Sequence, residues 1–554
     1  MNHKIKYLIL LTGLALSFTA CKDKGISEEK TTAMSYTDVT SDVGMNFKYT
    51  FGDTTYENIL ESSGSGVSVI DFDNDGDMDL YMLNGTYLEG ISDDDGMVFA
   101  NTPNRLFSNN GDGTFTDVTG SAGVGDTHWS MAAATVDFDN DNDTDIYLLN
   151  YGPNVFYLNN GDGTFTDIAD SLGLVGPDSL NGYPTWSVSA AFWDYNSDGA
   201  LDVMLGNFLA FDPAYFSPSA PDMMPHPAEY KGQASLLYQQ QADGSFTDVT
   251  KQTGFYYPDS KCMGLTVFDY DHDGDMDLFQ GNDHQENFLF QNDGAGNFKE
   301  VGKTSGVVVN DQGHPTGSMH GTIGDVDGDG LADLLVTDLK YGALYRNAGK
   351  GLFEDITARS GVAREFAGKG EWYAALFDYD NDGDLDIFSA NGTAEELIVQ
   401  LPLLLENDGK GNFKNVGPEV SDYFTTKRSG RGGAVLDYDN DGDLDIVVSH
   451  LDGAGDAVLL RNDGSNKNHW LGLELKGKNG AASAIGATVT VYMGDMKLVR
   501  VNQWGNGYMG FNDPRVHFGL GQHEKVDKVE VLWADGDTTV LEGVEVDRYM
   551  EIKQ

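Results

Sequence analysis

One ten-residue pattern occurs seven times along the chain and constrains its fold more than any other feature. It reads DFDNDGDMDL in the first copy and DYDNDGDLDI in the last two. The copies begin at Asp71, Asp137, Asp194, Asp269, Asp325, Asp378 and Asp437. Their starts lie 66, 57, 75, 56, 53 and 59 residues apart. Periods of this size are typical of architectures in which each repeat forms one four-stranded sheet.

The residues around each copy have the patterns of strands and turns. Apolar, β-branched segments flank the acidic residues, as in GVSVI before Asp71 and LYMLN after Asp79. A strand, turn and strand then follow, as in RLFSNNGDGTFTDVT and LYRNAGKGLFEDIT. The sequence therefore predicts an all-β fold, a seven-bladed β-propeller over residues 35–465, with insertions in the first and third intervals.

The last repeat differs from the others and indicates how the ring closes. It reads LLRNDGSNKNHWLGLEL and lacks the F-x-D-[VI]-T ending, whereas an unattached SYTDVTSDVG stands at residues 35–44. We expect the N-terminal segment to supply the outer strand of the last blade. Such closure removes the free sheet edge that would otherwise favour aggregation.

The seven copies, here called acidic loops one to seven, have the composition of a cation-binding loop. Calcium takes six to eight oxygen ligands, which a tight loop supplies from alternating side chains and one backbone carbonyl. In loop one, positions 1, 3, 5 and 9 are Asp71, Asp73, Asp75 and Asp79, and the carbonyl of Asp77 at position 7 is the expected fifth donor. We therefore expect about seven bound Ca²⁺ ions.

The same five positions define the expected ligands in the other loops. They are Asp137, Asp139, Asp141, Asp143 and Asp145; Asp194, Asn196, Asp198, Ala200 and Asp202; Asp269, Asp271, Asp273, Asp275 and Asp277; Asp325, Asp327, Asp329, Leu331 and Asp333; Asp378, Asp380, Asp382, Asp384 and Asp386; and Asp437, Asp439, Asp441, Asp443 and Asp445. Asn142 replaces the usual glycine and Asn196 replaces an aspartate, so loops two and three are expected to bind calcium most weakly. An EF-hand is excluded, because position 12 is Met82 in loop one and Gln280 in loop four instead of glutamate.

Both parts of the chain resemble known families. The acidic loops and the N-x-x-G-x-F-x-D-V-T units are similar to FG-GAP/VCBS propeller repeats. Residues 466–554 contain HWLGLELKG, GATVTVYMG and QWGNGYMGFNDPRVHFGLG, and this portion resembles the ASPIC/UnbV domain of the cartilage acidic protein family. The resemblance implies a small C-terminal β domain. Trp504, Tyr508, Asp513, Arg515 and His517 match the pattern of that domain, and we do not interpret them as catalytic.

The first residues and the overall charge constrain location and partners. Lys4 and Lys6, an apolar stretch from Tyr7 to Phe18 and then Thr19-Ala20-Cys21 resemble a bacterial lipoprotein signal. This predicts a signal peptide over residues 1–20, a linker over residues 21–34, lipidation of Cys21 and attachment to the outer membrane through that anchor only. An ordinary cleaved signal is the alternative. The formal charge of −54 argues against nucleic acid as a partner.

The segments that lead into the innermost strands are rich in functional side chains. They contain Glu61, His128, Trp129, Trp186, Lys261, His320, Glu371, Trp372, Arg428 and Arg431, each five to ten residues before an acidic loop. In one interpretation they fill the channel and satisfy one another. In the other they form a ligand site, in which the tryptophans stack on a sugar or aromatic ring and the basic side chains bind an anionic group.

The sequence leaves the function open among three hypotheses. No nucleophile elbow, HExxH, phosphate loop or Rossmann fingerprint is present. We expect a non-enzymatic surface binding or adhesion module whose ligand is a glycan or a surface protein. A carbohydrate-active enzyme of the lyase or dehydratase type is the second hypothesis, and a scaffold in an outer-membrane uptake complex is the third. Cys262 is interpreted as a buried thiol rather than a nucleophile.

Overall fold

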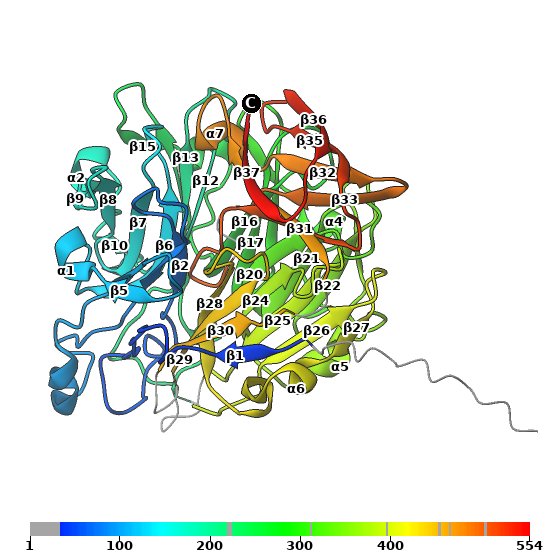
Figure 1. Cartoon of the computed structure of the whole chain (residues 1–554). Helices are drawn as coiled ribbons and strands as arrows, with labels where there is room; N and C mark the ends of the chain where they lie inside the picture. The colour runs from blue at the N-terminus through cyan, green and yellow to red at the C-terminus, as the bar shows by residue number, and fades with distance from the viewer. Residues whose placement is uncertain are drawn as a thin grey trace, which may run out of the picture. The chain divides into compact units, whose positions relative to one another are not determined.

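The computed structural model describes residues 34–218, 224–310, 313–394, 397–451, 456–464, 467–503 and 507–554. These residues form seven propeller blades and a C-terminal β domain (Figure 1). The predicted signal peptide, Cys21 and all of the linker except Met34 lie outside the described residues. Within them, no helix combines the length and apolar character needed to cross a bilayer.

The first four blades are antiparallel sheets whose strands follow chain order from the innermost to the outermost. They comprise β2 (Val67–Ile70), β3 (Asp79–Met82), β4 (Arg105–Asn109) and β5 (Phe115–Asp117); β6 (Trp129–Val136), β7 (Asp145–Tyr151), β8 (Val155–Asn159) and β9 (Phe165–Asp167); β12 (Ser187–Trp193), β13 (Asp202–Asn207), β14 (Leu236–Gln240) and β15 (Phe246–Asp248); and β16 (Cys262–Phe268), β17 (Asp277–Gln285), β18 (Phe288–Asn292) and β19 (Phe298–Glu300).

Blades five and six repeat this order, and blade seven has β1 (Tyr36–Asp38) as its outermost strand. They comprise β20 (Thr316–Gly324), β21 (Asp333–Asp338), β22 (Ala343–Asn347) and β23 (Phe353–Asp355); β24 (Glu371–Phe377), β25 (Asp386–Asn391), β26 (Leu403–Asn407) and β27 (Phe413–Asn415); and β28 (Gly430–Leu436), β29 (Asp445–His450), β30 (Val458–Asn462) and β1. Pairing of β17 with β20 also joins blades four and five into one eight-stranded sheet.

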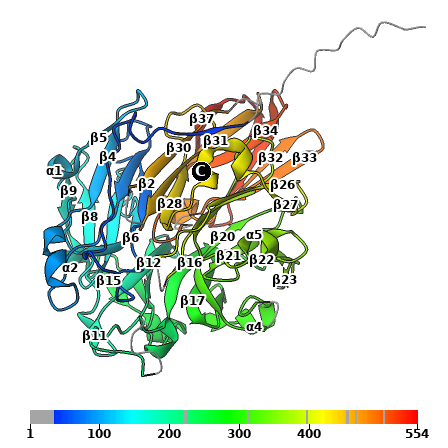
Figure 2. The same cartoon turned by 90° about the horizontal axis from the view of Figure 1, so that it is seen from below.

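The innermost strands contact one another in a closed ring, from β2 through β6, β12, β16, β20 and β24 to β28 and back to β2. Figure 2 shows the blades following one another around this ring. Small residues such as Ala132 and Gly433 let the strands approach closely near the axis. The seven-bladed all-β prediction is confirmed.

The N-terminal segment closes the ring as predicted. Strand β1 pairs antiparallel with β30, with Tyr36 opposite Asn462 and Asp38 opposite Leu460. The blue β1 lies beside the late blade strands in Figure 1. The first and last parts of the propeller therefore share one sheet, which leaves no unpaired outer edge in that blade.

Short helices and connections complete the propeller. Six of them follow the outer strands: α1 (Thr119–Ala122), α2 (Ala169–Leu172), α3 (Thr250–Thr253), α4 (Gly302–Ser305), α5 (Val362–Phe366) and α6 (Gly417–Val420). The described parts of the long insertions, residues 83–104, 208–218 and 224–235, contain the 3₁₀ helices η1 (Asp94–Phe99) and η2 (Pro227–Glu229). A third 3₁₀ helix, η3 (Asp422–Thr425), precedes blade seven, and a hairpin of β10 (Ser179–Leu180) and β11 (Tyr183–Pro184) precedes blade three.

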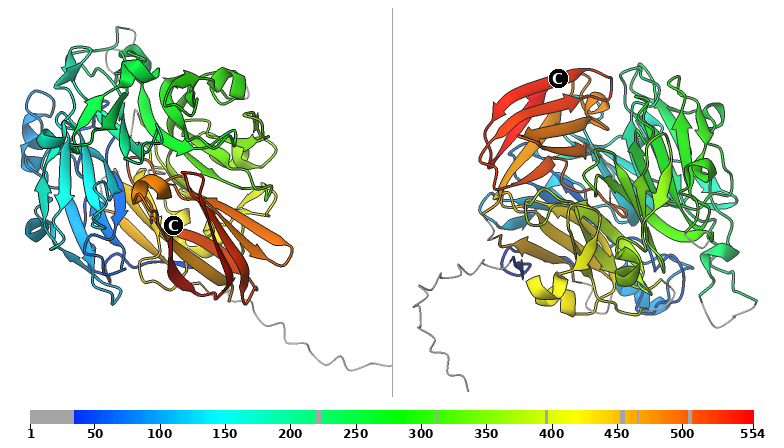
Figure 3. Two further views of the ribbon diagram at one scale, coloured as in Figure 1. Left: turned by 90° about the horizontal axis from the view of Figure 1, so that it is seen from above. Right: turned by 90° about the vertical axis from the view of Figure 1, so that its right-hand side faces the viewer.

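The C-terminal domain consists of two sheets around its own apolar core. One sheet has the order β34-β31-β37 and the other β33-β32-β35-β36. Their bounds are β31 (His469–Lys476), β32 (Thr488–Met493), β33 (Met496–Val501), β34 (Val516–Gly521), β35 (Val526–Leu532), β36 (Thr538–Val544) and β37 (Arg548–Lys553), and α7 (Ala481–Ala484) follows β31. In Figure 3 these orange and red strands lie against one end of the ring.

A segment of this domain fills the propeller channel. Tyr508 and Met509 are buried, and Phe511 forms a parallel bridge to Ser68 of blade one. The approach is so close that a Cβ atom on Gly66 would lie 2.0 Å from the carbonyl oxygen of Met509. A glycine is therefore required at position 66, and the C-terminal domain is an integral part of the channel.

Candidate metal centres

Each acidic loop connects the first and second strands of its blade. Because all seven blades share one topology, the loops lie together at one end of the ring, here called the loop face. The connections between second and third strands, including residues 83–104, 208–218 and 224–235, lie at the opposite end, here called the insertion face. The repeat thus places seven groups of carboxylates around a single axis.

Position 9 of every loop fixes the loop to its own blade. Asp79 is buried, and its Oδ1 accepts from the Asn109 amide at 2.7 Å while its Oδ2 accepts from the Phe72 amide at 3.0 Å. The same pair of contacts occurs at Asp145, Asp202, Asp277, Asp333, Asp386 and Asp445. Desolvation raises the pKa of Asp79 to about 9 and that of Asp202 to about 8.

The oxygen atoms at the other positions converge. In loop one, carboxylate oxygens of Asp71, Asp73 and Asp79 lie within 4.8 Å of one another, and loops two and five have the same grouping. The buried Oδ1 atoms of Asp71 and Asp271 have no hydrogen-bond partner among the described residues. A buried carboxylate oxygen without a partner is unfavourable unless a cation binds it. The donor set therefore fits a hard divalent cation such as Ca²⁺.

The backbone turns that shape the loops use residues suited to left-handed conformations. Position 4 has positive φ in every loop, at +60° for Asn74 and +62° for His272. Position 6 is also left-handed, with φ of +87° at Gly76 and +73° at Asn142. Loop two thus adopts the same turn with asparagine, at a modest conformational cost. The prediction that loops two and three bind most weakly remains a prediction.

Asparagines link the loops of neighbouring blades. The Asn109 amide donates to the carbonyl of Tyr438 in loop seven at 2.6 Å, and Asn159 makes the same contact with Phe72 at 2.8 Å. Four further asparagines at this strand position, Asn292, Asn347, Asn407 and Asn462, repeat it. In six of the seven blades, the asparagine that ends the third strand therefore connects its blade to the loop of the preceding blade, whereas blade three has Gln240 at this position.

Loop five contains a feature that the loop sequences did not indicate. Arg346 on β22 pairs with Asp327, and its Nη2 lies 2.5 Å from Oδ2 of Asp329. These carboxylates hold positions 3 and 5. At the corresponding strand position, loop four has Gln291, whose amide donates to Asp271 at 2.6 Å, and loop six has Glu406. The strand behind each loop thus sets a different local charge.

The C-terminal domain covers loops six and seven. The Tyr549 hydroxyl donates to Oδ2 of Asp437 at 2.6 Å, and the Gly519 amide donates to Oδ2 of Asp378 at 3.1 Å. Arg515 donates to the carbonyl of Asp437 at 2.9 Å and is held by an ion pair of 2.6 Å with Asp513. Asp513 and Arg515, which sequence reasoning left without a role, fix the domain to loop seven.

The ten candidate residues in the segments that lead into the innermost strands, here called the mouth residues, are divided between buried and exposed positions. Eight are buried, namely Glu61, Trp129, Trp186, Lys261, His320, Glu371, Trp372 and Arg431. His128 is exposed and pairs with Asp126 at 2.8 Å, and Arg428 is half-buried. The structure therefore does not assemble these residues around one open cavity, because the channel is filled by side chains.

Arg431 illustrates why the predicted anion site does not form as expected. Its guanidinium donates to the carbonyls of Ser62 at 2.9 Å and Thr393 at 2.7 Å, and it lies 4.0 Å from the centre of the Trp372 ring. Lys261 likewise donates to the carbonyl of Pro227 at 2.8 Å. These buried cations are satisfied by backbone carbonyls, which corrects the assignment of Arg431 and Lys261 to anion capture.

The two glutamates of this set, Glu61 and Glu371, differ in their hydrogen-bond partners. The Glu61 carboxylate accepts from the amides of Glu57 at 2.5 Å and Asn58 at 3.1 Å. Both oxygens of Glu371 are buried and have no hydrogen-bond partner among the described residues. Desolvation, with the Asp338 carboxylate nearby, raises the pKa of Glu371 well above its usual value.

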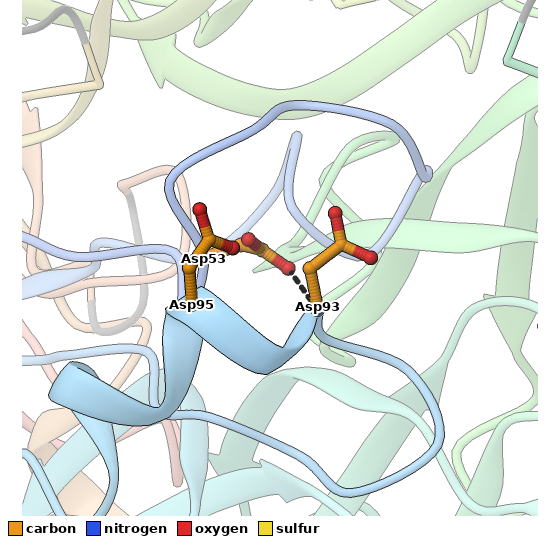
Figure 4. Close-up of side chains that lie close together, drawn as sticks. All are labelled: Asp53, Asp93 and Asp95. Carbon is orange, nitrogen blue, oxygen red and sulfur yellow. Dashed lines mark hydrogen bonds between the residues drawn. The ribbon is translucent and has the colours of Figure 1, made fainter.

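A further acidic cluster lies outside the acidic loops, between the segment before β2 and the insertion of blade one. Carboxylate oxygens of Asp53, Asp93 and Asp95 lie within 4.8 Å of one another (Figure 4). Oδ2 of Asp53 accepts from the Asp93 amide at 2.6 Å, and Thr54 donates to Asp95 at 2.6 Å. These contacts explain the cluster as a connection between two loop segments.

The other residues discussed from the sequence are Cys262 and three residues of the C-terminal domain. Cys262 is buried, and burial raises the pKa of its thiol to about 12, which agrees with an inert thiol. Tyr508 lies in the filled channel, and Nε2 of His517 lies 3.0 Å from the carbonyl of Gly442. Trp504 lies outside the described residues.

Comparison with known proteins agrees with this architecture. The FG-GAP-like repeat family matches residues 92–148, 137–205, 229–280, 277–336, 325–389 and 378–448, and the ASPIC and UnbV family matches residues 477–554. Cartilage acidic protein 1 of Mus musculus is 30% identical over 280 residues, which are 47% of this chain and 40% of that protein. The Homo sapiens protein is 31% identical over 281 residues, 47% of this chain and 39% of that protein. The matched region spans about two fifths of these curated relatives.

Solved structures show only distant similarity. An Agrocybe aegerita lectin, described for its recognition of non-reducing terminal N-acetylglucosamine, matches with a TM-score of 0.38 and 16% identity over 66% of this chain and 88% of the lectin. The V. cholerae biofilm matrix protein Bap1 matches with a TM-score of 0.32 and 11% identity over 94% of this chain and 85% of Bap1. The repeat family covers more than half of the chain and the second family follows it, so this chain belongs to the FG-GAP-repeat proteins with a C-terminal ASPIC/UnbV domain, to which cartilage acidic protein 1 is homologous.

Proposed function

We propose that this chain is an exported lipoprotein whose calcium-loaded propeller acts as a binding or adhesion module at the cell surface. The observation that carries the calcium part is the repeated donor arrangement, in which carboxylate oxygens of Asp71, Asp73 and Asp79 converge and one buried oxygen lacks a partner. Positions 1, 3, 5 and 9, with the carbonyl at position 7, would hold the ion in each loop. Calcium would neutralise the like charges there.

The proposed location and partners follow from the terminal sequence and the charge. A lipid on Cys21 would attach the chain to the outer membrane, and diacylation gives stable attachment where a single acyl chain gives only marginal binding. The formal charge of −54 favours partners other than nucleic acid, and a glycan or a surface protein is the proposed ligand. Binding rather than catalysis is proposed because no catalytic motif occurs in the sequence.

Metal analysis tests the calcium part of this proposal. We expect elemental analysis of the purified full chain to find several calcium ions per molecule, up to about seven. Chelation should lower the melting temperature, because each site occupied at about 100 times its dissociation constant contributes about 2.7 kcal/mol. Calcium should restore the melting temperature more effectively than magnesium. A melting curve that chelator leaves unchanged would contradict the proposal.

Fractionation and attachment assays test the remaining parts. Cys21→Ala should release the chain from the membrane fraction or block its processing, whereas Cys262→Ala is the matched control and should leave attachment unchanged. Beads coated with the full chain should bind a glycan array or isolated cell envelopes in a calcium-dependent manner. Equal binding by beads coated with the chelated chain would refute a calcium-dependent adhesion module.

A further inference from the structure

A cavity of about 550 Å³ opens on the insertion face, at the opposite end of the ring from the acidic loops. Its lining comes from three blades: Leu88 and Ile91 from the insertion of blade one, Tyr151 from blade two and Phe211 from the insertion of blade three. Residues 175–178 and 183–184, which connect blades two and three, complete it. Cavities of this size are typical of ligand sites.

The walls of this cavity, here called the insertion pocket, are held by packing and hydrogen bonds. The Tyr151 ring lies 6.2 Å from the Phe211 ring and 5.8 Å from the Trp186 ring, both edge to face. The Tyr183 hydroxyl donates to Asp212 at 2.8 Å, and the Asn154 amide donates to the carbonyl of Val175 at 2.9 Å. The pocket is therefore formed by the folded blades and does not require a closing movement.

The charged residues that line the pocket are acidic. Glu89 and Asp178 line it and are exposed, and no lysine, arginine or histidine occurs among the described residues that line it. The remaining lining is dominated by aromatic, proline and aliphatic residues. Aromatic faces and carboxylates both attract cations, whereas the apolar floor requires an apolar group.

We propose that the insertion pocket binds a segment of a partner protein in which an apolar side chain lies next to a lysine or arginine. The apolar side chain would pack against Tyr151 and Phe211, and the basic group would lie between Glu89 and Asp178. This inference rests on the proposal that the chain is a binding module, and it identifies the surface and the chemistry of its partner.

The surroundings of the pocket favour a protein over a free small molecule. The two insertions that line it also expose apolar side chains, with Met97 58%, Val98 77% and Phe216 64% exposed. Large exposed apolar side chains near a pocket are typical of protein-binding surfaces. A second copy of this chain is disfavoured as the occupant, because two chains of formal charge −54 repel each other.

A displayed library of random peptides, selected on the calcium-loaded full chain, tests this inference. We expect the recovered peptides to combine aromatic or aliphatic residues with adjacent lysine or arginine. The double variant Glu89→Lys/Asp178→Lys should bind these peptides at least tenfold more weakly. Glu524→Lys/Glu542→Lys is the matched control, because it makes the same charge change at exposed residues of the C-terminal domain and should bind like the wild type.

A second variant tests the apolar part of the site. Leu88→Ser removes apolar lining from a half-buried side chain and should weaken binding about tenfold while the melting temperature changes little. Peptides that bind the Glu89→Lys/Asp178→Lys variant as tightly as the wild type would overturn the pocket assignment and leave the binding-module proposal intact. Failure to recover any peptide, or preference for small organic cations over peptides, would also overturn it. Calcium content and cell-envelope attachment report separately on the proposed function.

Discussion

Acidic loops one and seven have almost the same sequence but lie in different surroundings. Loop one reads DFDNDGDMDL and loop seven DYDNDGDLDI, so their expected ligands are identical in type. Asp71 is half-buried and its Oδ1 lacks a partner. Asp437 is fully buried and accepts from the Tyr549 hydroxyl at 2.6 Å and the Gly442 amide at 2.8 Å. The C-terminal domain produces this difference.

The comparison shows that the loop sequence alone does not determine how a cation is held. Desolvation raises the pKa of Asp437 to about 7 and that of Asp71 to about 6, although Tyr549 and Arg515 partly stabilise the charged form of Asp437. A cation in loop seven would be enclosed by protein, whereas one in loop one would remain near solvent. We therefore expect slower exchange of calcium at loop seven than at loop one.

Removal of the first ligand in each loop should give the largest difference. Asp437→Ala leaves the amides of Asp441 and Gly442 and the Tyr549 hydroxyl without an acceptor in a buried region. Each unsatisfied group costs about 1–3 kcal/mol, so we expect a loss of about 3 kcal/mol or more. Asp71→Ala should cost less, because water can reach the groups it leaves. Chemical denaturation of both variants in calcium measures this, and equal losses would remove the distinction between the loops.

A single hydroxyl tests the contribution of the C-terminal domain. Tyr549→Phe removes the bond to Asp437 and should cost about 1.5–3 kcal/mol, because the bond is made to a charged group. Calcium release from one site should also become faster in stopped-flow experiments with chelator. Tyr492→Phe is the matched control in the same domain, since its hydroxyl makes only a 3.4 Å contact with Glu530. Unchanged release kinetics in Tyr549→Phe would show that this contact does not retain the ion.

Much of the fold was readable from the sequence because its information is local and repeated. Seven copies with similar spacing predicted seven blades, and the missing ending of the last repeat predicted the pairing of β1 with β30. The acidic positions of each loop also converge as expected where the structure groups them. These features depend on neighbouring residues, so a pattern can indicate them.

The surroundings of the loops were not readable in the same way. Tyr549 contacts Asp437 across 112 residues of sequence, and Tyr508 enters the channel from a different domain. The mouth residues were correctly expected near the innermost strands, but their rotamers and burial depend on packing between blades. Side chains such as Arg431 are therefore satisfied internally, which no local pattern distinguishes from a ligand site.

Loop five differs from loops one and seven, because the guanidinium of Arg346 lies against two of its expected calcium ligands, Asp327 and Asp329. A divalent ion and a guanidinium about 4 Å apart repel each other by about 2 kcal/mol even in water. Arg346→Gln should therefore raise the calcium affinity of one site about tenfold or more in calorimetric titration. Arg105→Gln is the control, because it removes the same charge from a partly exposed ion pair with Asp117 at 2.9 Å. Weaker calcium binding by Arg346→Gln would indicate that Arg346 organises the loop.

The smallest expected effect concerns Glu371, a buried carboxyl that stands seven residues before loop six and has no hydrogen-bond partner among the described residues. Since its pKa in the folded chain is raised, the folded state retains a proton that the unfolded chain releases. Stability at this site is therefore present below about pH 4.5 and is lost as the pH rises toward the folded pKa. Each pKa unit within that window corresponds to about 1.4 kcal/mol.

Glu371→Gln should remove this dependence, because a neutral amide does not release a proton. Between pH 4 and pH 8 in calcium-containing buffer, we expect the variant to gain free energy of unfolding relative to the wild type, by about 1.4 kcal/mol for each pKa unit of the shift within that range, measured by chemical denaturation. Glu61→Gln is the contrasting variant, because its carboxylate accepts from the amides of Glu57 and Asn58, and we expect it to destabilise the chain. If Glu371→Gln destabilises the chain at pH 8, the Glu371 carboxylate is charged and bound by a cation. Burial of carboxylates on both faces of the ring would then depend on cations, and the contrast between acidic loops and channel residues would disappear.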